Sequence, residues 1–175
     1  MSMFTIIMIL FLLERADPSL LVNAQCAVNF RVINAGLEVE GTLKVKNANI
    51  IFDPENLQRA SIHVSADPSS IETGIGIRDK HLRRSDYFDT NAYPEIQLRS
   101  KSFRKAGKNK FEGRFDLTIK STTKEVTISF NRKKNGEVTI YEGDFEINRL
   151  DFNIGDESLT LDDTVHITVR ASGKF

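Results

Sequence analysis

Histidine is the residue from which acid–base chemistry or metal binding would first be expected, and the chain has three. His63 and His166 take the polar positions of segments in which polar and apolar residues alternate, so we expect both to face solvent. Neither has a second histidine or a cysteine two or four residues away, the short spacing typical of metal ligands. His81 lies in a segment without alternation, where it could act as a base, as a donor to a ligand head group or as an ordinary loop residue. These positions predict no metal site and no catalytic residue.

Other arrangements that often carry chemistry are incomplete. The stretch 73–76 has two glycines but lacks the third glycine of a dinucleotide loop and the Lys-Ser/Thr ending of a phosphate loop, so we expect a turn. A Gly-x-Ser-x-Gly nucleophile motif does not occur. Asp151, Asp162 and Asp163 could hold a cation, but adjacent acidic loop residues usually face water. The regular acidic spacing of a calcium loop is absent.

The composition is that of an ordinary globular protein, with 175 residues, 40% of them hydrophobic and 27% charged. This length predicts one domain with a core large enough to need no disulfide. The single cysteine excludes both an internal disulfide and a cysteine-cluster metal site. Lysine plus arginine is 24 and aspartate plus glutamate is 24, so the net charge is zero. We therefore expect no nucleic-acid partner, because such binding depends mainly on neutralising phosphates.

Most of the chain after residue 26 alternates between apolar and polar residues with a period of two, which is typical of strands with one buried face. Turn-forming residues separate about eight or nine such segments, which we expect to be short. The pattern predicts an all-β fold, an antiparallel barrel or a sandwich. Val138 and Ile140 have the opposite parity to Phe145 and Ile147, which predicts a bulge or bend at Gly143 between them.

Residues 73–88 break the alternation and are rich in basic side chains. Asp79 and Arg83 stand four residues apart, the spacing of a helical ion pair. We expect a short helical loop of about two turns, inserted between two strands near residues 74–90. Long loops in compact domains are usually functional or packed as lids.

Parity assigns the apolar side chains of the strands to the interior. The inward-facing residues expected to form the site are Phe30, Val32, Ile62, Val64, Ile96, Leu98, Phe111, Phe115, Leu117, Ile128, Phe130, Phe145, Ile147, Val165 and Ile167. In a small barrel such residues either fill the core or line a cavity for an apolar ligand. Periodicity alone leaves both alternatives open.

The N-terminus carries a run of ten apolar residues, Phe4–Leu13, which is too short to cross a bilayer and has the length of a signal-peptide core. Residues 22–24 (Val-Asn-Ala) suit cleavage after Ala24, so we expect residues 1–24 to be a signal peptide and residues 25–175 to be the mature chain. Cys26 follows closely and could carry a lipid. Because Gln25 precedes it, where lipoprotein processing requires a small residue, we expect a half-buried thiol at the start of the first strand instead.

Several ordered motifs resemble those of the YceI-like family of polyisoprenoid-binding proteins. The resemblance is carried by residues 70–74 (SIETG), 78–83 (RDKHLR), 87–94, 117–124 and 147–155 (INRLDFNIG), and it extends over about residues 27–173. The chain departs from the family pattern at Glu72, Tyr87, Ser121 and Glu125, and its part before Asp53 is shorter than in many members.

The resemblance implies a lipocalin-like antiparallel barrel of about eight strands around a tunnel, in a periplasmic protein. It implies a bound isoprenoid lipid, with the tail of a quinone or polyprenyl lipid in the tunnel, and no cofactor or catalytic residue. The tunnel mouth, or the anchor of its loop, would be formed by Arg78, Asp79, His81, Leu82, Arg83, Phe88 and Tyr93. The expected function is that of a lipid carrier or reservoir. Transient contact with a membrane and formation of a homodimer are both possible for such a protein. The alternatives are an enzyme or sensor acting on a quinone or lipid head group, and a packed module without a ligand.

Overall fold

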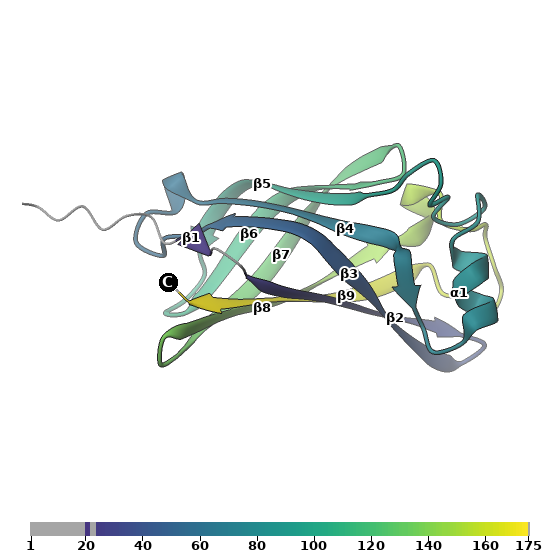
Figure 1. Ribbon diagram of the computed structural model, residues 1–175, viewed down its shortest axis with the longest axis horizontal. Coiled ribbons are helices and arrows are strands. Elements are labelled where there is room, and N and C mark those ends of the chain that lie inside the picture. The colour runs from purple at the N-terminus through teal and green to yellow at the C-terminus, as the bar shows by residue number, and fades with distance from the viewer. Residues whose placement is uncertain (1–19, 22–23, 175) are drawn as a thin grey trace, which may run out of the picture.

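The protein is described here by a computed structural model covering residues 20–21 and 24–174 (Figure 1). Its long strands are β2 (Gln25–Asn34), β3 (Leu37–Ile51), β4 (Ser61–Glu72), β5 (Ile96–Lys105), β6 (Lys110–Ile119), β7 (Thr122–Asn135), β8 (Val138–Asn148) and β9 (Thr164–Lys174). The remaining elements are β1 (Leu20–Leu21), α1 (Gly76–Leu82) and two 3-10 turns, η1 (Leu57–Arg59) and η2 (Arg149–Phe152). The predicted signal peptide, residues 1–24, lies outside the described residues except for β1 and Ala24, and it stays a prediction.

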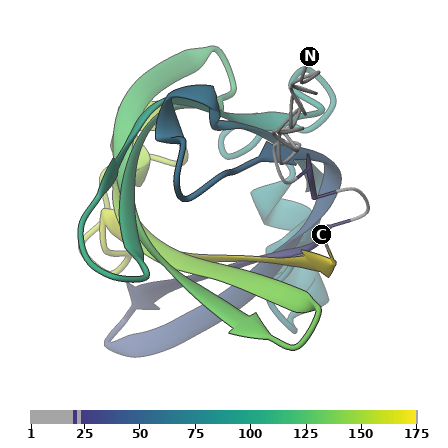
Figure 2. The ribbon, with the colours of Figure 1, turned by 90° about the vertical axis from the view of Figure 1, so that its left-hand side faces the viewer.

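The strands form one closed antiparallel barrel (Figure 2). Each strand from β2 to β9 pairs with its neighbour in the chain, and the pairing of β2 with β9 closes the ring. The predicted all-β barrel of about eight strands is thereby confirmed. The strands are longer than predicted, from 10 residues in β2 to 15 in β3. The short β1 adds to the outer edge of β3.

Strand β6 shows why the alternation was informative. Its buried positions are Phe111, Gly113, Phe115, Leu117 and Ile119, and the residues between them are exposed or half-buried. Successive side chains of a strand point to opposite faces, so a polar face toward water and an apolar face toward the interior follow directly from the sequence.

The predicted bulge at Gly143 of β8 is wrong. Its pairing with β7 and with β9 continues through Gly143 without a register shift. The inward positions are odd throughout, because Thr139 and Tyr141 are buried while Val138 and Ile140 lie on the outer face. The parity was misread because two polar residues face inward at this end of the barrel.

Gly143 is needed for packing instead of for a bend. A Cβ atom at this position would lie 2.8 Å from the Phe130 Cβ and 2.9 Å from the Ser129 carbonyl oxygen. Glycine therefore lets the phenylalanine of β7 pass close to the backbone of β8.

Thr139 can be used to test whether a polar group buried inside the barrel destabilises the fold. Its side chain is fully buried, and its hydroxyl has no hydrogen-bond partner within the described residues. Because a buried hydroxyl without a partner is costly, we expect Thr139→Val to raise the free energy of unfolding by about 1 kcal/mol. Thermal denaturation measures this, with Thr127→Val on the exposed face of β7 as the control. A loss of stability in Thr139→Val would mean that the hydroxyl is satisfied, for example by a buried water.

One end of the barrel is filled by aromatic rings. Phe52 packs edge to face against Phe103, Phe111, Phe130 and Tyr141, with ring centroids 5.2–5.4 Å apart. Such arrangements are favoured over face-to-face stacking. We call these five residues the aromatic plug. They close the end of the barrel at which β1 and the C-terminus lie (Figure 1).

The opposite end is covered by α1 and by two loops that are tied together through the backbone (Figure 1). The Ala35 amide of the β2–β3 turn donates to Thr160 at 2.7 Å, and the Gly155 amide donates to Asp86 at 2.8 Å. The loop of residues 153–163 thus joins the hairpin on one side to the segment after α1 on the other. Within the described residues, no helix is long and apolar enough to cross a membrane.

Candidate functional site

A cavity of about 660 Å³ lies inside the barrel. All eight long strands contribute apolar side chains to its wall. It extends from Cys26, beside the aromatic plug, to Ile77 and His81 on α1. The volume is within the range of ligand-binding cavities in proteins.

The structure places the predicted interior residues in the cavity wall, with one exception. The wall includes Phe30, Val32, Ile62, Val64, Ile96, Leu98, Phe115, Leu117, Ile128, Phe130, Phe145, Ile147, Val165 and Ile167. Phe111 is the exception, because it is 1% exposed and packs inside the aromatic plug. Both alternatives left open by periodicity apply: side chains fill the barrel at the plug, and Phe52, Phe130 and Tyr141 of the plug also border the cavity that the rest of the barrel lines. That these residues contact a ligand stays a prediction.

Sequence reasoning missed part of the wall. Val28, Val39, Leu43, Val45 and Val169 also line the cavity. Their parity was visible in the sequence and would have been enough to include them. The loop residues Ile154 and Leu161 line it as well, and no periodic signal could have revealed residues outside strands.

The predicted ion pair between Asp79 and Arg83 is wrong. The buried Asp79 carboxylate accepts the Thr73 amide at 2.9 Å and also the Thr73 hydroxyl. Arg83 donates instead to the Ile71 carbonyl oxygen at 2.9 Å. The i, i+4 pair does not form because the Asp79 carboxylate is bonded to Thr73 and the Arg83 guanidinium to Ile71. This hydrogen bond ties the end of α1 to the end of β4.

Residues at the mouth divide into those that line the cavity and those that hold α1 in place. Arg78, His81, Leu82 and Phe88 are in the cavity wall, whereas Asp79, Arg83 and Tyr93 are not. Arg78 also bonds Thr73, through Nε to the hydroxyl at 2.8 Å and through Nη2 to the carbonyl oxygen at 2.9 Å. Thr73 therefore fixes the approach to α1, with Asp79 and Arg78 on either side of it.

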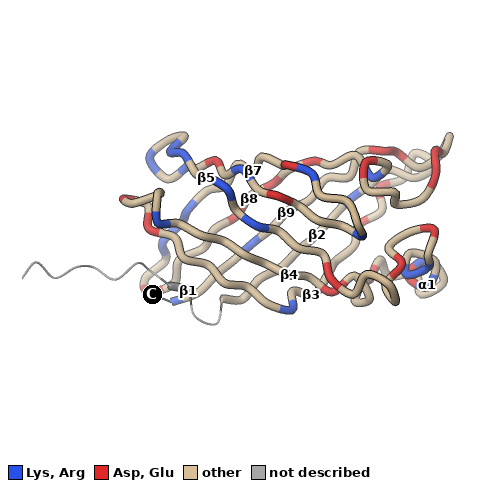
Figure 3. Tube along the Cα trace, turned by 90° about the horizontal axis from the view of Figure 1, so that it is seen from above, with Lys and Arg blue, Asp and Glu red and all other residues tan. Residues whose placement is uncertain are grey.

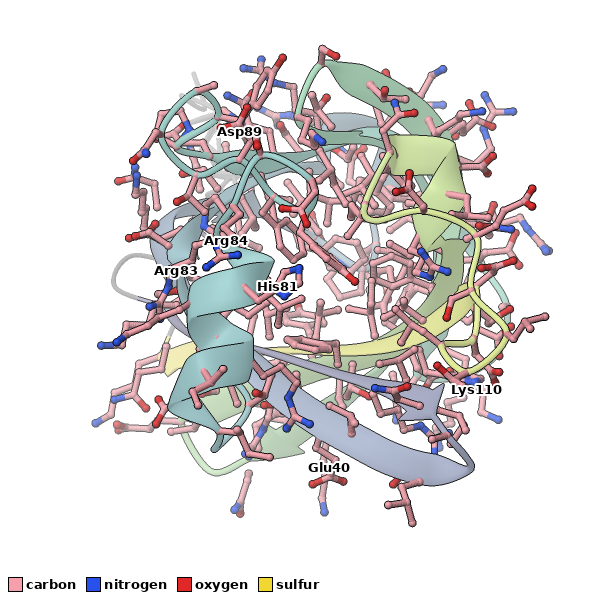
Figure 4. The ribbon with its side chains drawn as sticks, turned by 90° about the vertical axis from the view of Figure 1, so that its right-hand side faces the viewer. Glu40, His81, Arg83, Arg84, Asp89 and Lys110 are labelled. Atoms are coloured by element: carbon pink, nitrogen blue, oxygen red, sulfur yellow. The ribbon has the colours of Figure 1, made fainter. Side chains whose placement is uncertain are left out.

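His81 is the titratable side chain of α1 that points from the helix toward the centre of the mouth (Figure 4). Its Nε2 lies 3.0 Å from Asp86 Oδ2, and its ring packs edge to face on Tyr87 with centroids 4.9 Å apart. Partial desolvation would raise the pKa of Asp86, but the hydrogen bond from His81 and the nearby Arg84 outweigh it and lower that pKa. His63 and His166, which we expected to face solvent, are both half-buried. His166 pairs with Glu146 and keeps 42% of its side chain exposed, whereas the Nε2 atom of His63 is buried without a hydrogen-bond partner within the described residues.

Cys26 lies at the other end of the cavity. It is half-buried in β2, packs against the aromatic plug and contributes to the cavity wall. Burial raises the pKa of its thiol. The structure thus places Cys26 as a half-buried thiol at the start of a strand. Its modification by lipid is untested.

Arg149 holds the loop that borders the mouth. It is 2% exposed and donates to the carbonyl oxygens of Ile154, Asp156 and Asp162 at 2.8–3.1 Å. Its Nη2 also pairs with Asp163 at 2.8 Å. These contacts fasten residues 153–163 to the end of β8. Arg149 belongs to the motif of residues 147–155, but nothing in the sequence indicated this anchoring role.

The chemistry available in the cavity is burial of apolar surface with few polar groups. The polar side chains of the wall include Arg78, His81, Tyr87 and Arg149 at the mouth and Tyr141 in the aromatic plug. Within the described part of the chain, no group of three or more His, Cys, Asp or Glu side chains could hold a metal ion. The arrangement suits a ligand with a long apolar part and a polar group at the mouth.

Comparisons with known proteins agree with this geometry. A model of the YceI-like domain matches residues 21–172. The protein YceI of Escherichia coli O157:H7 is 31% identical over 134 residues, which cover 73% of this chain and 70% of that protein. A protein of Vibrio parahaemolyticus is 28% identical over 139 residues, covering 75% of this chain and 74% of its own.

Solved structures share the barrel. Burkholderia cenocepacia BcnA has a TM-score of 0.80 and 26% identity, and the match covers 85% of this chain and 96% of that chain. A polyisoprenoid-binding domain from Saccharophagus degradans has a TM-score of 0.67 with 11% identity, covering 90% and 99% of the two chains. At that identity the second likeness supports the fold alone. The match to the domain model spans nearly every described residue, and this chain therefore belongs to the YceI-like family.

Proposed function

We propose that the protein binds a long-chain isoprenoid lipid, the tail of a quinone or polyprenyl lipid, as a carrier or reservoir in the periplasm. The observation that carries the proposal is the continuous apolar cavity, which extends from the aromatic plug to α1. Membership of the YceI-like family and the name of the Saccharophagus relative support an isoprenoid as the ligand. The family membership and the apolar cavity favour a binding protein over an enzyme. The apolar run of residues 4–13 supports export.

The shape of the cavity favours a chain over a compact ligand. A strand of ten residues is about 34 Å long, and wall residues come from most of the length of β2 and β9. An isoprenoid tail has no hydrogen-bonding groups, so its affinity must come from burial. Each buried CH₂ group contributes about 0.8 kcal/mol before the costs of ordering.

The mouth supplies the polar contacts that a head group needs. Arg78 and His81 both line the cavity there, and a guanidinium beside an imidazole suits a phosphate or a quinone oxygen. Arg83, by contrast, is not in the cavity wall, and it donates to the Ile71 carbonyl oxygen. We therefore assign head-group contact to Arg78 and His81 only.

The test is organic extraction of the purified protein followed by mass spectrometry, with a variant that blocks the tunnel. Val169 faces the cavity midway along β9, so we expect Val169→Phe to displace part of the tail. Losing burial of two methylene groups costs about 1.6 kcal/mol, which weakens binding roughly tenfold. Thr168→Phe places the same ring on the outer face and is the matched control.

Cys26 gives a second measure of occupancy on the same samples. It is the one cysteine of the chain and lines the cavity, so a bound tail should slow its alkylation. We expect Cys26 to be alkylated slowly in the wild type and in Thr168→Phe, and to be alkylated faster once the lipid has been extracted. The proposal fails if extracts contain no isoprenoid above the background of a control protein, or if Val169→Phe retains the same amount as the wild type.

A further inference from the structure

The exposed large hydrophobic side chains gather at one end of the molecule. Within the described residues they are Leu37, Ile75, Ile77 and Leu159. Ile77 is 85% exposed, and Leu159 is fully exposed. Single exposed aliphatic residues are common on protein surfaces, but a set confined to one place calls for a partner.

These residues come from three segments that surround the cavity mouth. Leu37 follows the β2–β3 turn, Ile75 and Ile77 stand at the start of α1, and Leu159 lies in the loop of residues 153–163. That loop bonds the hairpin through Ala35 and Thr160. Figure 4 looks onto this end of the barrel, and Figure 1 shows α1 and the hairpin on the same side, away from the aromatic plug. We call the four residues the apolar rim.

The rim is continuous with the cavity wall. Ile75 and Ile77 are exposed to solvent and also line the cavity, so the cavity opens to the surface beside them. The apolar surface of the rim therefore leads directly into the interior. An apolar chain that leaves a bilayer under the rim would enter the cavity without crossing water.

We propose that the apolar rim docks the mouth of the barrel on a lipid bilayer, with the four aliphatic side chains inserted among the head groups. This inference rests on the proposed function, because it supplies the route by which a membrane lipid reaches the cavity. Side chains that project from separate segments around an opening fit a fluid surface. A protein partner would instead need a packed patch with aromatic or arginine anchors.

The charges beside the rim indicate which bilayer it fits. Lys80 and Arg84 are exposed on the side of α1, while Glu38 and Glu157 are exposed next to Leu37 and Leu159. Figure 3 shows both signs mixed at this end of the barrel. Exposed acidic side chains, among them Glu38, Asp86 and Glu157, outnumber the exposed basic ones in the rim segments. Because this balance gives no attraction to anionic lipid, we expect apolar insertion into a zwitterionic surface, with no gain from anionic lipid.

The test is flotation with phosphatidylcholine vesicles, with and without phosphatidylglycerol, at low and high salt. We expect the wild type to float with both, and the double variant Leu37→Ser with Leu159→Ser, two rim residues outside the cavity wall, to bind about tenfold less, because the inserted apolar area is lost. The matched control is Ile140→Ser, which removes an outward-facing isoleucine near the opposite end of β8. All variants should keep the melting temperature and the co-purified lipid of the wild type.

The outcomes separate this proposal from the function on which it rests. Wild type that stays in solution, or a double variant that floats as well as wild type, overturns the rim proposal, and lipid in the extract then leaves the function standing. Absence of lipid from every extract counts against the function instead. If the double variant changes a dimer into a monomer in size-exclusion chromatography without changing flotation, the rim is a face between copies and the proposal is wrong.

Discussion

Replacing Arg149 with methionine is expected to lower the free energy of unfolding by about 3–5 kcal/mol. The side chain is 2% exposed and donates to four carbonyl oxygens and to the Asp163 carboxylate at 2.8–3.4 Å. Methionine preserves most of the volume but leaves these acceptors without their donor. For a chain of this size the melting temperature should fall by roughly 10 °C.

The loss should be accompanied by a local change at the mouth. Arg149 is the link between β8 and residues 153–163, and the Gly155 amide in that loop holds Asp86 beside His81. We therefore expect hydrogen exchange to rise in residues 153–163 and 84–88 before it rises in the barrel. Equal exchange in loop and barrel would contradict the role of Arg149 as an anchor.

The matched control is Arg104→Met. Arg104 forms a two-pronged ion pair with Glu112 at 2.6–2.7 Å, but its side chain is 68% exposed. Exposed ion pairs contribute little, because water screens the charges and both side chains lose freedom. A similar loss of stability in both variants would mean that charge, and not burial, sets the effect.

The strands and their inward faces were predictable because both are local properties of the sequence. Val165, Ile167 and Val169 alternate with polar residues, and the barrel places them as the period of two requires. The same reasoning misread β8, because Thr139 and Tyr141 face inward despite their polarity. The inward face of a strand is assigned from the positions of its apolar residues. Polar residues at inward positions therefore make the opposite face look like the inward one.

Contacts between segments distant in the chain were not predictable. Phe111 shares its parity with Phe115, yet the first belongs to the plug and the second to the cavity wall, because Phe52 approaches only at the end where Phe111 lies. Likewise, the partner of Arg83 is a carbonyl twelve residues earlier. Such partners depend on how the barrel closes. Local spacing carries no information about that closure.

Replacing Phe115 with aspartate is expected to have the largest effect, a loss of about 4 kcal/mol or more together with loss of bound lipid. Phe115 is 2% exposed, lines the cavity and packs edge to face on Phe103 with centroids 5.6 Å apart. Its ring lies over Gly113, where an added Cβ would meet it at 2.5 Å. Glycine has no side chain to occupy the vacated space, so the carboxylate would face an apolar wall without a partner.

A milder variant keeps this prediction testable if the aspartate variant does not fold. Phe115→Leu leaves the site apolar and removes only part of the ring, so it should fold and cost about 1–2 kcal/mol. Its cavity grows, so it should retain the lipid that the aspartate variant loses. Lys110→Asp, at an exposed position of the same strand, controls for the added charge and should change neither property.

Chemical denaturation and lipid extraction on these variants distinguish the roles of Phe115. If Phe115→Asp were as stable as Lys110→Asp, the ring would not be buried against Phe103 and the inward assignment of β6 would be wrong. If it folded poorly while the fraction that folded still carried lipid, the ring would support the barrel without forming the wall of the binding site. We expect both properties to fail together, because the ring packs against Phe103 and also lines the cavity in which the apolar chain would lie.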